Sequence, residues 1–268
     1  MSEPVVLCRT DGRGVATVTL NRPEVNNAYN AEVVQALLDI FGALAVDRAV
    51  RVIVIRGNGR HFQAVADLKW LQEIGRMDAA ANLETSRKTA TAMRGLNEMT
   101  KPTIALVHGA CVGGGTGIVA SCDVVIAEST ATFAITEARW GVAATVIFPQ
   151  LNTTIGLRQV RRYALTCERF DAQRAQSLGL VHEVCAPGAL DATAAPVIDG
   201  LLKAAPDSVA LSKRSAMLAA GAIISETEFT RIVGEHAAKR ASAEAAEGLQ
   251  SFVEKRDPTW YPGSAPAA

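Results

Sequence analysis

Residues Thr103 to Ala127 read T-I-A-L-V-H-G-A-C-V-G-G-G-T-G-I-V-A-S-C-D-V-V-I-A, and the rest of the chain can be understood from this stretch. Two short apolar runs, Ile104–Val107 and Val124–Ala127, flank the triple glycine Gly113–Gly115. Both runs are rich in β-branched residues and end at chain breakers, which predicts buried strands. Between them, Thr116–Ser121 is long enough for one or two helical turns. The expected order is strand, glycine turn, helix, strand.

The triple glycine has two interpretations. Glycines at the start of a helix let another group approach the bare backbone. The first N–H groups of a helix have no partner inside it and lie at its partly positive end, so such a turn can stabilise negative charge that develops on an oxygen. The same glycines could instead serve only to pack a helix tightly on a strand, and their spacing leaves both interpretations open. A phosphate-binding P-loop is excluded, because no Lys-Ser/Thr pair follows the glycines.

Composition indicates a globular protein with a sizeable core, since 49% of the 268 residues are hydrophobic and 20% are charged. The 27 basic residues balance 27 acidic ones, which gives no indication of nucleic acid as a partner. Five scattered cysteines form no Cys-x-x-Cys or Cys/His cluster, and we expect no disulfide framework and no metal site. Met1–Thr10 lacks the pattern of a signal peptide and no apolar run could span a membrane, so we expect a cytoplasmic protein without a membrane partner.

The remaining patterns predict strands that alternate with helices, which is typical of an α/β fold with a largely parallel sheet. Asn30 is the expected N-cap of a helix over Ala31–Val46. A long polar helix is expected over Ala79–Met99, ending before Lys101-Pro102. From Pro149 onward the chain is expected to be mostly helical. Further strands are predicted at Val5–Arg9, Val15–Leu20, Val52–Ile55, Ala131–Ala134 and Val181–Val184.

Several motifs follow one another along nearly the whole chain. They are Leu20-Asn21-Arg22-Pro23, Phe62–Leu68, Val107-His108-Gly109 with Gly113–Gly115, Cys122-Asp123, Glu137 with Gly141, and Phe170-Asp171-Ala172 with Gly179-Leu180-Val181. Each is weak alone, but in this order they resemble the crotonase (enoyl-CoA hydratase/isomerase) superfamily. The resemblance implies a spiral of ββα turns over residues 1–190 and a helical C-terminal region over 191–268 that builds a homotrimer, often paired into a hexamer. It also implies a coenzyme A thioester as the substrate, with no separate cofactor.

Within this superfamily, Ala66–Trp70, Gly113–Gly117 and Thr136–Arg139 look most like bacterial methylglutaconyl-CoA hydratases and their relatives that act on isohexenylglutaconyl-CoA. The implied activity is the addition of water across the double bond of a 2-enoyl-CoA thioester, with a branched glutaconyl-CoA favoured. Two alternatives stay open. One is an isomerase that uses a single glutamate, and the other is a homologue that binds CoA thioesters without catalysis.

The chemistry of a thioester explains the catalytic residues that the resemblance implies. The carbonyl oxygen gains negative charge as an enolate forms, and two backbone donors stabilise that charge. By resemblance, these donors are the N–H groups of Ala66 and Gly114, while the carbonyls of Ala64 and Ala66 meet the adenine amino group. Glu137 matches the family glutamate that acts on the α-carbon and the water, because a carboxylate can orient water and pass a proton. Without the resemblance, Glu137 would be interpreted as an exposed loop residue.

The remaining substrate-binding positions are also implied by the resemblance. Arg22 and Lys69 are candidates for the CoA phosphates, and Arg139 for the distal carboxylate of a glutaconyl substrate, although each could equally be a surface charge. Phe252 and Lys255 match positions that meet the nucleotide from a neighbouring subunit. The same site is expected to include Val65, Asp67, Leu68, Gly113 and Gly117.

Three positions depart from the family pattern. Gly117 stands where many enoyl-CoA hydratases carry a second glutamate, so the two-carboxylate mechanism is not available in its usual form. Val65 stands where the family has glycine, and valine avoids a positive φ and adds bulk beside the thioester. Ala144 stands where related hydratases often carry proline.

Overall fold

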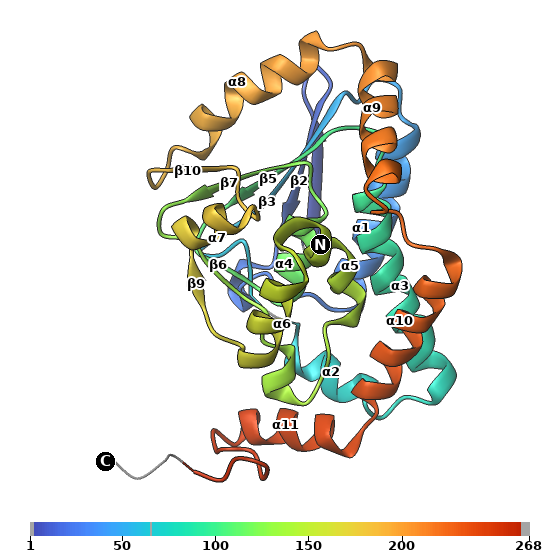
Figure 1. Cartoon of the computed structure of the whole chain (residues 1–268), viewed down its shortest axis with the longest axis vertical. Coiled ribbons are helices and arrows are strands. Elements are labelled where there is room, and N and C mark those ends of the chain that lie inside the picture. Colours follow the sequence, from blue (N-terminus) through green and yellow to red (C-terminus); the bar gives the residue numbers. More distant parts are fainter. Residues whose placement is uncertain (1–2, 65, 264–268) are drawn as a thin grey trace.

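Two β-sheets carry the fold in the computed structural model, which describes residues 3–64 and 66–263 of the chain (Figure 1). The larger sheet has the order β1 (Val6–Thr10), β2 (Val15–Leu20), β3 (Val52–Gly57), β5 (Thr103–Val107), β7 (Val124–Glu128) and β10 (Glu183–Cys185). The smaller sheet has the order β4 (Gln63–Ala64), β6 (Ala110–Val112), β8 (Thr132–Ala134) and β9 (Phe170–Asp171). The β1–β2 and β8–β9 pairs are antiparallel, and the other pairs in both sheets are parallel.

The chain winds as a spiral, because each turn adds one strand to each sheet. β3 is followed by β4, β5 by β6 and β7 by β8. The first strands of successive turns pair with one another, and so do the second strands. The ββα spiral expected from the sequence is therefore confirmed, although the number and length of the helices differ from turn to turn.

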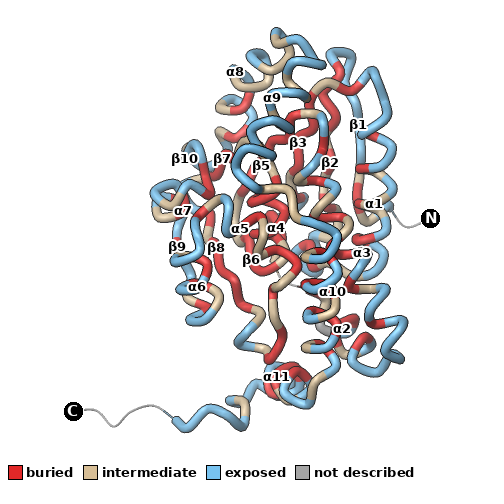
Figure 2. Tube along the Cα trace, turned by 45° about the vertical axis from the view of Figure 1, so that its right-hand side comes forward, coloured by how far each residue is buried: buried red, intermediate tan, exposed pale blue. Residues whose placement is uncertain are grey.

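The continuous apolar run of β3 is explained by burial on both faces of the sheet. Successive side chains of a strand point to opposite faces. Ile53 and Ile55 pack into the main core with α1 (Ala31–Val46) and α3 (Ala79–Asn97). Val52 and Val54 pack on the other face, where α8 (Leu190–Lys203) covers them through Leu190 and Ala194. Figure 2 shows the resulting buried strands inside a layer of more exposed helices.

The remaining helices include the mostly helical region that was expected from Pro149 onward. They are α2 (Leu68–Ile74), α4 (Gly114–Ala120), α5 (Phe148–Ile155), α6 (Leu157–Thr166), α7 (Ala172–Leu178), α9 (Pro206–Ala219), α10 (Glu226–Arg240) and α11 (Ala243–Val253), with short 3₁₀ helices η1 (Pro23–Val25), η2 (Glu137–Trp140) and η3 (Thr145–Ile147). The Asn30 side chain caps α1 by accepting a hydrogen bond from the Val33 N–H at 3.0 Å. The helix expected at Thr116 begins at Gly114 instead. Among the described helices, none is long and apolar enough to cross a lipid bilayer.

The C-terminal helices fold back onto the spiral of their own chain (Figure 1). α10 packs on α3, and α11 packs on α2 and on η2. Backbones touch at this last contact: a Cβ on Gly248 of α11 would lie 2.4 Å from the Trp140 carbonyl carbon, and one on Gly141 would lie 2.3 Å from the Glu244 oxygen. The helical region therefore helps to build the interior of this chain, whether or not it also joins subunits.

α9 differs from the other long helices because none of its residues is buried. Two of its leucines, Leu211 and Leu218, are 66% and 55% exposed. Apolar side chains gathered on an exposed helix are typical of a surface that another protein covers.

We expect a homotrimer or hexamer in solution, with α9 in a subunit contact. The double substitution Leu211→Asp and Leu218→Asp should lower the molar mass measured by light scattering at micromolar concentration, because burying two carboxylates in a contact is unfavourable. Val46→Asp is the matched control, since Val46 is 80% exposed on α1, and it should leave the mass unchanged. A wild-type protein that is only monomeric would contradict the expectation.

Asn27 ties the loop after β2 to the loop that leads into β4. It is 2% exposed and has a φ of 56°, which asparagine tolerates better than most residues. Its side-chain amide donates to the carbonyls of Asn58, His61 and Phe62 at 2.8, 2.8 and 3.2 Å, and its Oδ1 accepts from the Arg22 N–H at 2.9 Å. One buried side chain thus fixes two loops.

Asn27→Ala should lower the free energy of unfolding by about 2–4 kcal/mol, because buried carbonyls lose their donor. Urea unfolding at fixed protein concentration measures this difference. The exposed Asn152→Ala serves as the control and should change stability by less than about 0.5 kcal/mol. Equal effects of both substitutions would show that the Asn27 network contributes nothing specific.

Candidate active site

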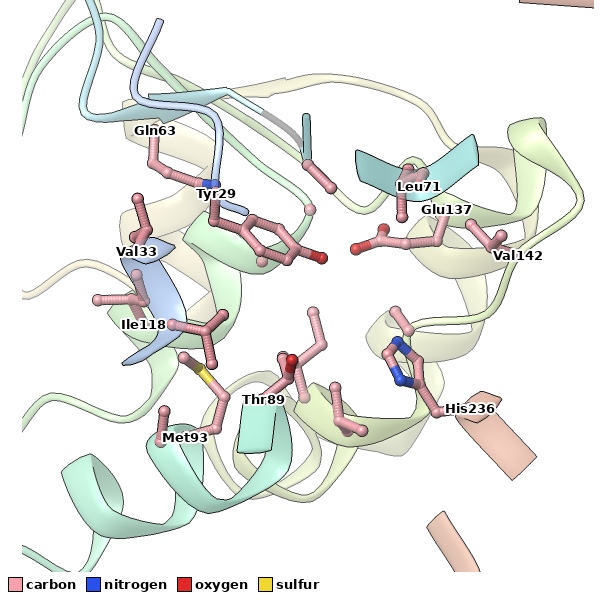
Figure 3. Close-up of a pocket in the computed structure, with 18 of the residues that line it drawn as sticks. Tyr29, Val33, Gln63, Leu71, Thr89, Met93, Ile118, Glu137, Val142 and His236 are labelled. Atoms are coloured by element: carbon pink, nitrogen blue, oxygen red, sulfur yellow. The ribbon is translucent and has the colours of Figure 1, made fainter. Parts of the chain in front are cut away.

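A mainly apolar cavity lies between α1, α3, α10, η2 and the start of α4 (Figure 3). Its apolar lining includes Val33, Val34, Leu37, Leu71, Ala92, Met93, Ile118, Val142, Val146 and Ile147. The polar side chains that reach it are Tyr29, Gln63, Thr89, Thr136, Glu137, His236 and Arg240. A concave apolar pocket with a few convergent polar groups is typical of a site for a small molecule.

Each residue of the triple glycine is required by a different neighbour. A Cβ on Gly113 would lie 2.9 Å from Glu137 Oε1, one on Gly114 would lie 2.8 Å from the Tyr29 ring, and one on Gly115 would lie 2.5 Å from Gln63 Oε1. Gly113 also has a φ of 60°, which favours glycine. Gly114 is the first residue of α4 and lines the cavity. Tight packing is therefore one role of the glycines, and it brings the start of the helix to the cavity.

Ala66 and Gly114 line the same cavity. Each follows a strand of the smaller sheet, in which Ala64 of β4 pairs with Val112 of β6. Ala66 forms a parallel bridge with Tyr29 and lines the cavity together with Gly114. The two expected backbone donors, which are far apart in the sequence, are thus brought to one cavity.

Glu137 is the first residue of η2 and follows β8. Its Oε2 is buried and has no hydrogen-bond partner among the described residues. Burial disfavours the charged form and raises the pKa of the Glu137 carboxyl to about 7, although backbone hydrogen bonds oppose this shift. A carboxyl group with this pKa can take up and give back a proton at neutral pH.

The Tyr29 hydroxyl and the Glu137 carboxylate point toward one another across the cavity (Figure 3). The ring of Tyr29 also contacts Trp70 edge to face, with centroids 5.5 Å apart. Burial and the negative charge of Glu137 raise the pKa of the Tyr29 phenol above its usual range, so the phenol stays protonated and can donate a hydrogen bond. The sequence alone does not single out Tyr29, because a tyrosine directly before an N-cap follows no functional pattern.

The other binding residues expected near Ala66 either interact with neighbouring residues of the protein, are exposed, or are not fully described by the structure. Arg22 Nη2 forms an ion pair with Asp67 Oδ2 at 3.1 Å. Asp67 also caps α2, since its Oδ1 accepts from the Lys69 N–H at 3.1 Å, and the Lys69 residue is exposed. Val65 lies outside the described residues, and Leu68 begins α2 without a described side chain. Contact of these residues with CoA stays a prediction.

Arg139 does not line this cavity, and its expected contact with the distal carboxylate of a substrate stays a prediction. It is exposed and, together with Phe252 and Lys255, lines a separate surface cleft. On η2, with three residues per turn, side chains two positions apart point in directions about 120° apart, so Glu137 and Arg139 do not share a face. Glu137 lines the cavity, and Arg139 lines the cleft. In the cleft, the Phe252 ring lies edge to face with Trp140, with centroids 4.3 Å apart.

Gly117 is buried under the cavity wall and does not line the cavity. A Cβ at this position would lie 2.2 Å from Ile147 Cγ2 and 3.5 Å from Met93 Sδ, and both of these residues line the cavity. Ile147 thus occupies the space into which a second glutamate would project. Glu137 is the one carboxylate among the described residues of the cavity wall.

His236 and Arg240 of α10 also line the cavity and were not anticipated from the sequence. A signal was present, because residues four apart on a helix share a face, and a histidine and an arginine stand at that spacing. Within residues 3–64 and 66–263, no three His, Cys, Asp or Glu side chains are grouped so that they could hold a metal ion.

Known proteins with similar sequences and structures place this site in a family. The chain is 32% identical over 252 residues to a mevalonyl-coenzyme A hydratase of Aspergillus fumigatus, covering 92% of each chain. It is 31% identical over 251 residues to the 2,3-dehydroadipyl-CoA hydratase of Escherichia coli, covering 91% of this chain and 94% of that protein. An enoyl-CoA hydratase structure from Mycobacterium avium superposes with a TM-score of 0.84 at 33% identity, covering 97% of this chain and all of the other. Since the sequence model described as enoyl-CoA hydratase/isomerase also matches residues 10–262, the chain belongs to the enoyl-CoA hydratase/isomerase family.

Proposed function

We propose that this enzyme, a hydro-lyase acting on enoyl-CoA thioesters, hydrates a branched glutaconyl-CoA such as methylglutaconyl- or isohexenylglutaconyl-CoA. The observation that carries the proposal is the buried carboxylate of Glu137, which faces the cavity that Ala66 and Gly114 also line. CoA enters as part of the substrate, and the mechanism needs no separate cofactor.

The reaction can be balanced with a single carboxylate. The N–H groups of Ala66 and Gly114 donate to the thioester oxygen, and each such donor typically contributes about 2.7–4 kcal/mol to transition-state stabilisation. The ionised Glu137 takes a proton from water as the water oxygen bonds to the β-carbon, and the electrons of the double bond move to form the enolate. Glu137 then gives that proton to the α-carbon, which restores its carboxylate and completes the addition of water.

The names of the two curated relatives support a substrate with a polar acyl chain. They are described as acting on mevalonyl-CoA and on 2,3-dehydroadipyl-CoA, and neither acyl group ends in a plain alkyl chain. For the CoA moiety, we propose that the Ala64 and Ala66 carbonyls meet the adenine, and that Phe252 and Lys255 of a neighbouring subunit contact the nucleotide.

An isomerase that moves the double bond is the second candidate. It is favoured by the single carboxylate in the described cavity wall, because proton abstraction and return need only one base. Incubation in ¹⁸O-labelled water separates the two functions. Hydration places ¹⁸O in the acyl product, whereas isomerisation moves the double bond without it.

Glu137→Gln should lower kcat by about 10²–10⁴-fold, because the amide keeps the size of the side chain but carries no transferable proton. The Kd for the CoA thioester should change little, since the expected oxyanion donors are backbone groups. In the wild-type enzyme, kcat/KM should rise with pH through an apparent pKa near 7, because the ionised form of Glu137 starts the reaction and its pKa is raised to about 7.

The exposed Glu73→Gln is the control for this experiment and should keep both kcat and the pH profile. The steady-state rates of the three proteins should be compared between pH 5 and 9. Turnover of Glu137→Gln at the wild-type rate would refute the assignment of Glu137 as the acid–base group.

Gly117→Glu should fail to create a two-carboxylate site in the wild-type background. Its side chain would overlap Ile147, and overpacking of a buried site typically costs about 1–3 kcal/mol. Adding Ile147→Ala removes the overlapping atoms, so the double variant should recover part of the lost Tm and hydrate faster than Gly117→Glu alone. A Gly117→Glu single variant with unchanged Tm would show that the wall around Ile147 adapts without cost.

A further inference from the structure

A buried polar cluster stands at the α10 side of the cavity, within a lining that is otherwise mostly apolar. His236 and Arg240 of α10 contribute to it and reach the cavity, while Asn82 and Ser86 of α3 stand behind them. All four residues are buried, with Arg240 only 5% exposed. The mechanism proposed above does not use any of them.

Arg240 is a buried cation without an anion. Its Nη2 donates to the Asn82 carbonyl at 3.1 Å, to Asn82 Oδ1 at 2.9 Å and to Ser86 Oγ at 2.7 Å. Among the described residues no carboxylate acts on Arg240, whose charge interacts only with the Tyr29 phenol, and its buried Nε has no hydrogen-bond partner there. Burial lowers the pKa of Arg240 to about 10, which still leaves the guanidinium charged at neutral pH. A desolvated charge is costly unless an opposite charge compensates it.

His236 adds a neutral donor next to this charge. Ser86 Oγ accepts a hydrogen bond from Arg240, so its own hydrogen is available for His236 Nδ1, which lies 3.0 Å away. Burial and the charge of Arg240 lower the pKa of His236 to about 3, and the ring is therefore neutral. A neutral ring that accepts at Nδ1 carries its hydrogen on Nε2. Figure 3 shows this ring pointing into the cavity.

We propose that Arg240 and His236 bind a carboxylate at the far end of the substrate's acyl chain, which makes the enzyme selective for enoyl-CoA thioesters of dicarboxylic acids. The carboxylate supplies the missing anion and accepts hydrogen bonds from the guanidinium and from His236 Nε2–H. Asn82 and Ser86 position the two donors. A plain alkyl end would leave the charge of Arg240 unpaired, and a hydroxyl end would accept a hydrogen bond without neutralising that charge.

This inference rests on the proposed function and assigns recognition of the acyl chain to Arg240 instead of Arg139. Arg139 lines the surface cleft, whereas Arg240 lines the cavity and comes from α10, about a hundred residues later in the chain. A purely structural role for Arg240 would be to link α3 to α10 through its three hydrogen bonds. The two roles differ in substrate dependence, because loss of a link affects every substrate alike.

Paired substrates of equal length test the proposal. One pair is glutaconyl-CoA and 2-pentenoyl-CoA, which have five acyl carbons each. The other pair is 2,3-dehydroadipyl-CoA and 2-hexenoyl-CoA, which have six. For at least one pair, wild-type kcat/KM should favour the dicarboxylic member by about 100-fold or more, since a site built for a polar group rejects analogues that lack it. Arg240→Met should lower kcat/KM for that member by about 100-fold and raise it for the alkyl member. Arg231→Met, an exposed arginine of the same helix, is the matched control and should keep the wild-type ratio.

The variants Arg240→Lys and Arg240→Gln distinguish loss of the carboxylate contact from a folding defect, because both keep a hydrogen-bond donor toward α3. The lysine variant should retain part of the preference, and the glutamine variant should lose it at a Tm near that of the wild type. Equal losses for both members of each pair, or a wild-type preference for alkyl or hydroxyl ends, would overturn the proposal.

Binding of saturated thioesters separates this proposal from the proposed function. Calorimetry should show that glutaryl-CoA or adipyl-CoA binds the wild-type protein more tightly than pentanoyl-CoA or hexanoyl-CoA, and that Arg240→Met removes the difference. If this preference is found but no enoyl-CoA is hydrated, the carboxylate site stands and the hydratase proposal fails. If hydration occurs without any preference in binding or rate, the carboxylate site is refuted and the hydratase proposal stands.

Discussion

The close contact of three side chains with the turn before α4 is the constraint on which the rest of the site depends. Glu137, Tyr29 and Gln63 each approach one residue of the triple glycine at a distance that a Cβ would not permit. These side chains come from three separate parts of the spiral, so the glycines are the point where its turns meet. Any larger residue there would push at least one of them away and would separate the acid–base candidate from the expected backbone donors.

Burial within this packed wall changes the acid–base chemistry of Glu137. The wall around Glu137 excludes water from its Oε2, and the resulting loss of hydration brings the pKa of its carboxyl to about 7. Ile147 fills the space beside Gly117, and the described cavity wall has no second carboxylate that could take part in the proton transfers. A single group that titrates near neutral pH can both accept and return the proton, and this makes the loss of the second glutamate compatible with hydration.

The C-terminal helices contribute residues to the site as well as packing on the spiral. α11 holds η2 through backbone contacts at Gly141 and Gly248, and η2 carries Glu137. α10 supplies His236 and Arg240, which introduce a charge into an otherwise mostly apolar cavity. The same cavity therefore carries the groups expected to react with the thioester and groups suited to an acidic acyl chain. α9, by contrast, leaves its leucines exposed and is the part of the region best suited to a subunit contact.

The sequence by itself determined the local features, because short-range physics controls them: the apolar runs of β3, β5 and β7, the cap at Asn30, and the family motifs that pointed to Glu137 and the triple glycine. It could not place Arg139, since spacing in a connecting segment says nothing about the 3₁₀ turn after which this residue lines the surface cleft. It also passed over Tyr29 and Arg240, which look like ordinary helix-flanking and helix residues. Only the tertiary structure brings α10 and the segment before α1 to the cavity beside the triple glycine, because contacts between distant segments, and the burial that changes their pKa values, exist only once the chain has folded.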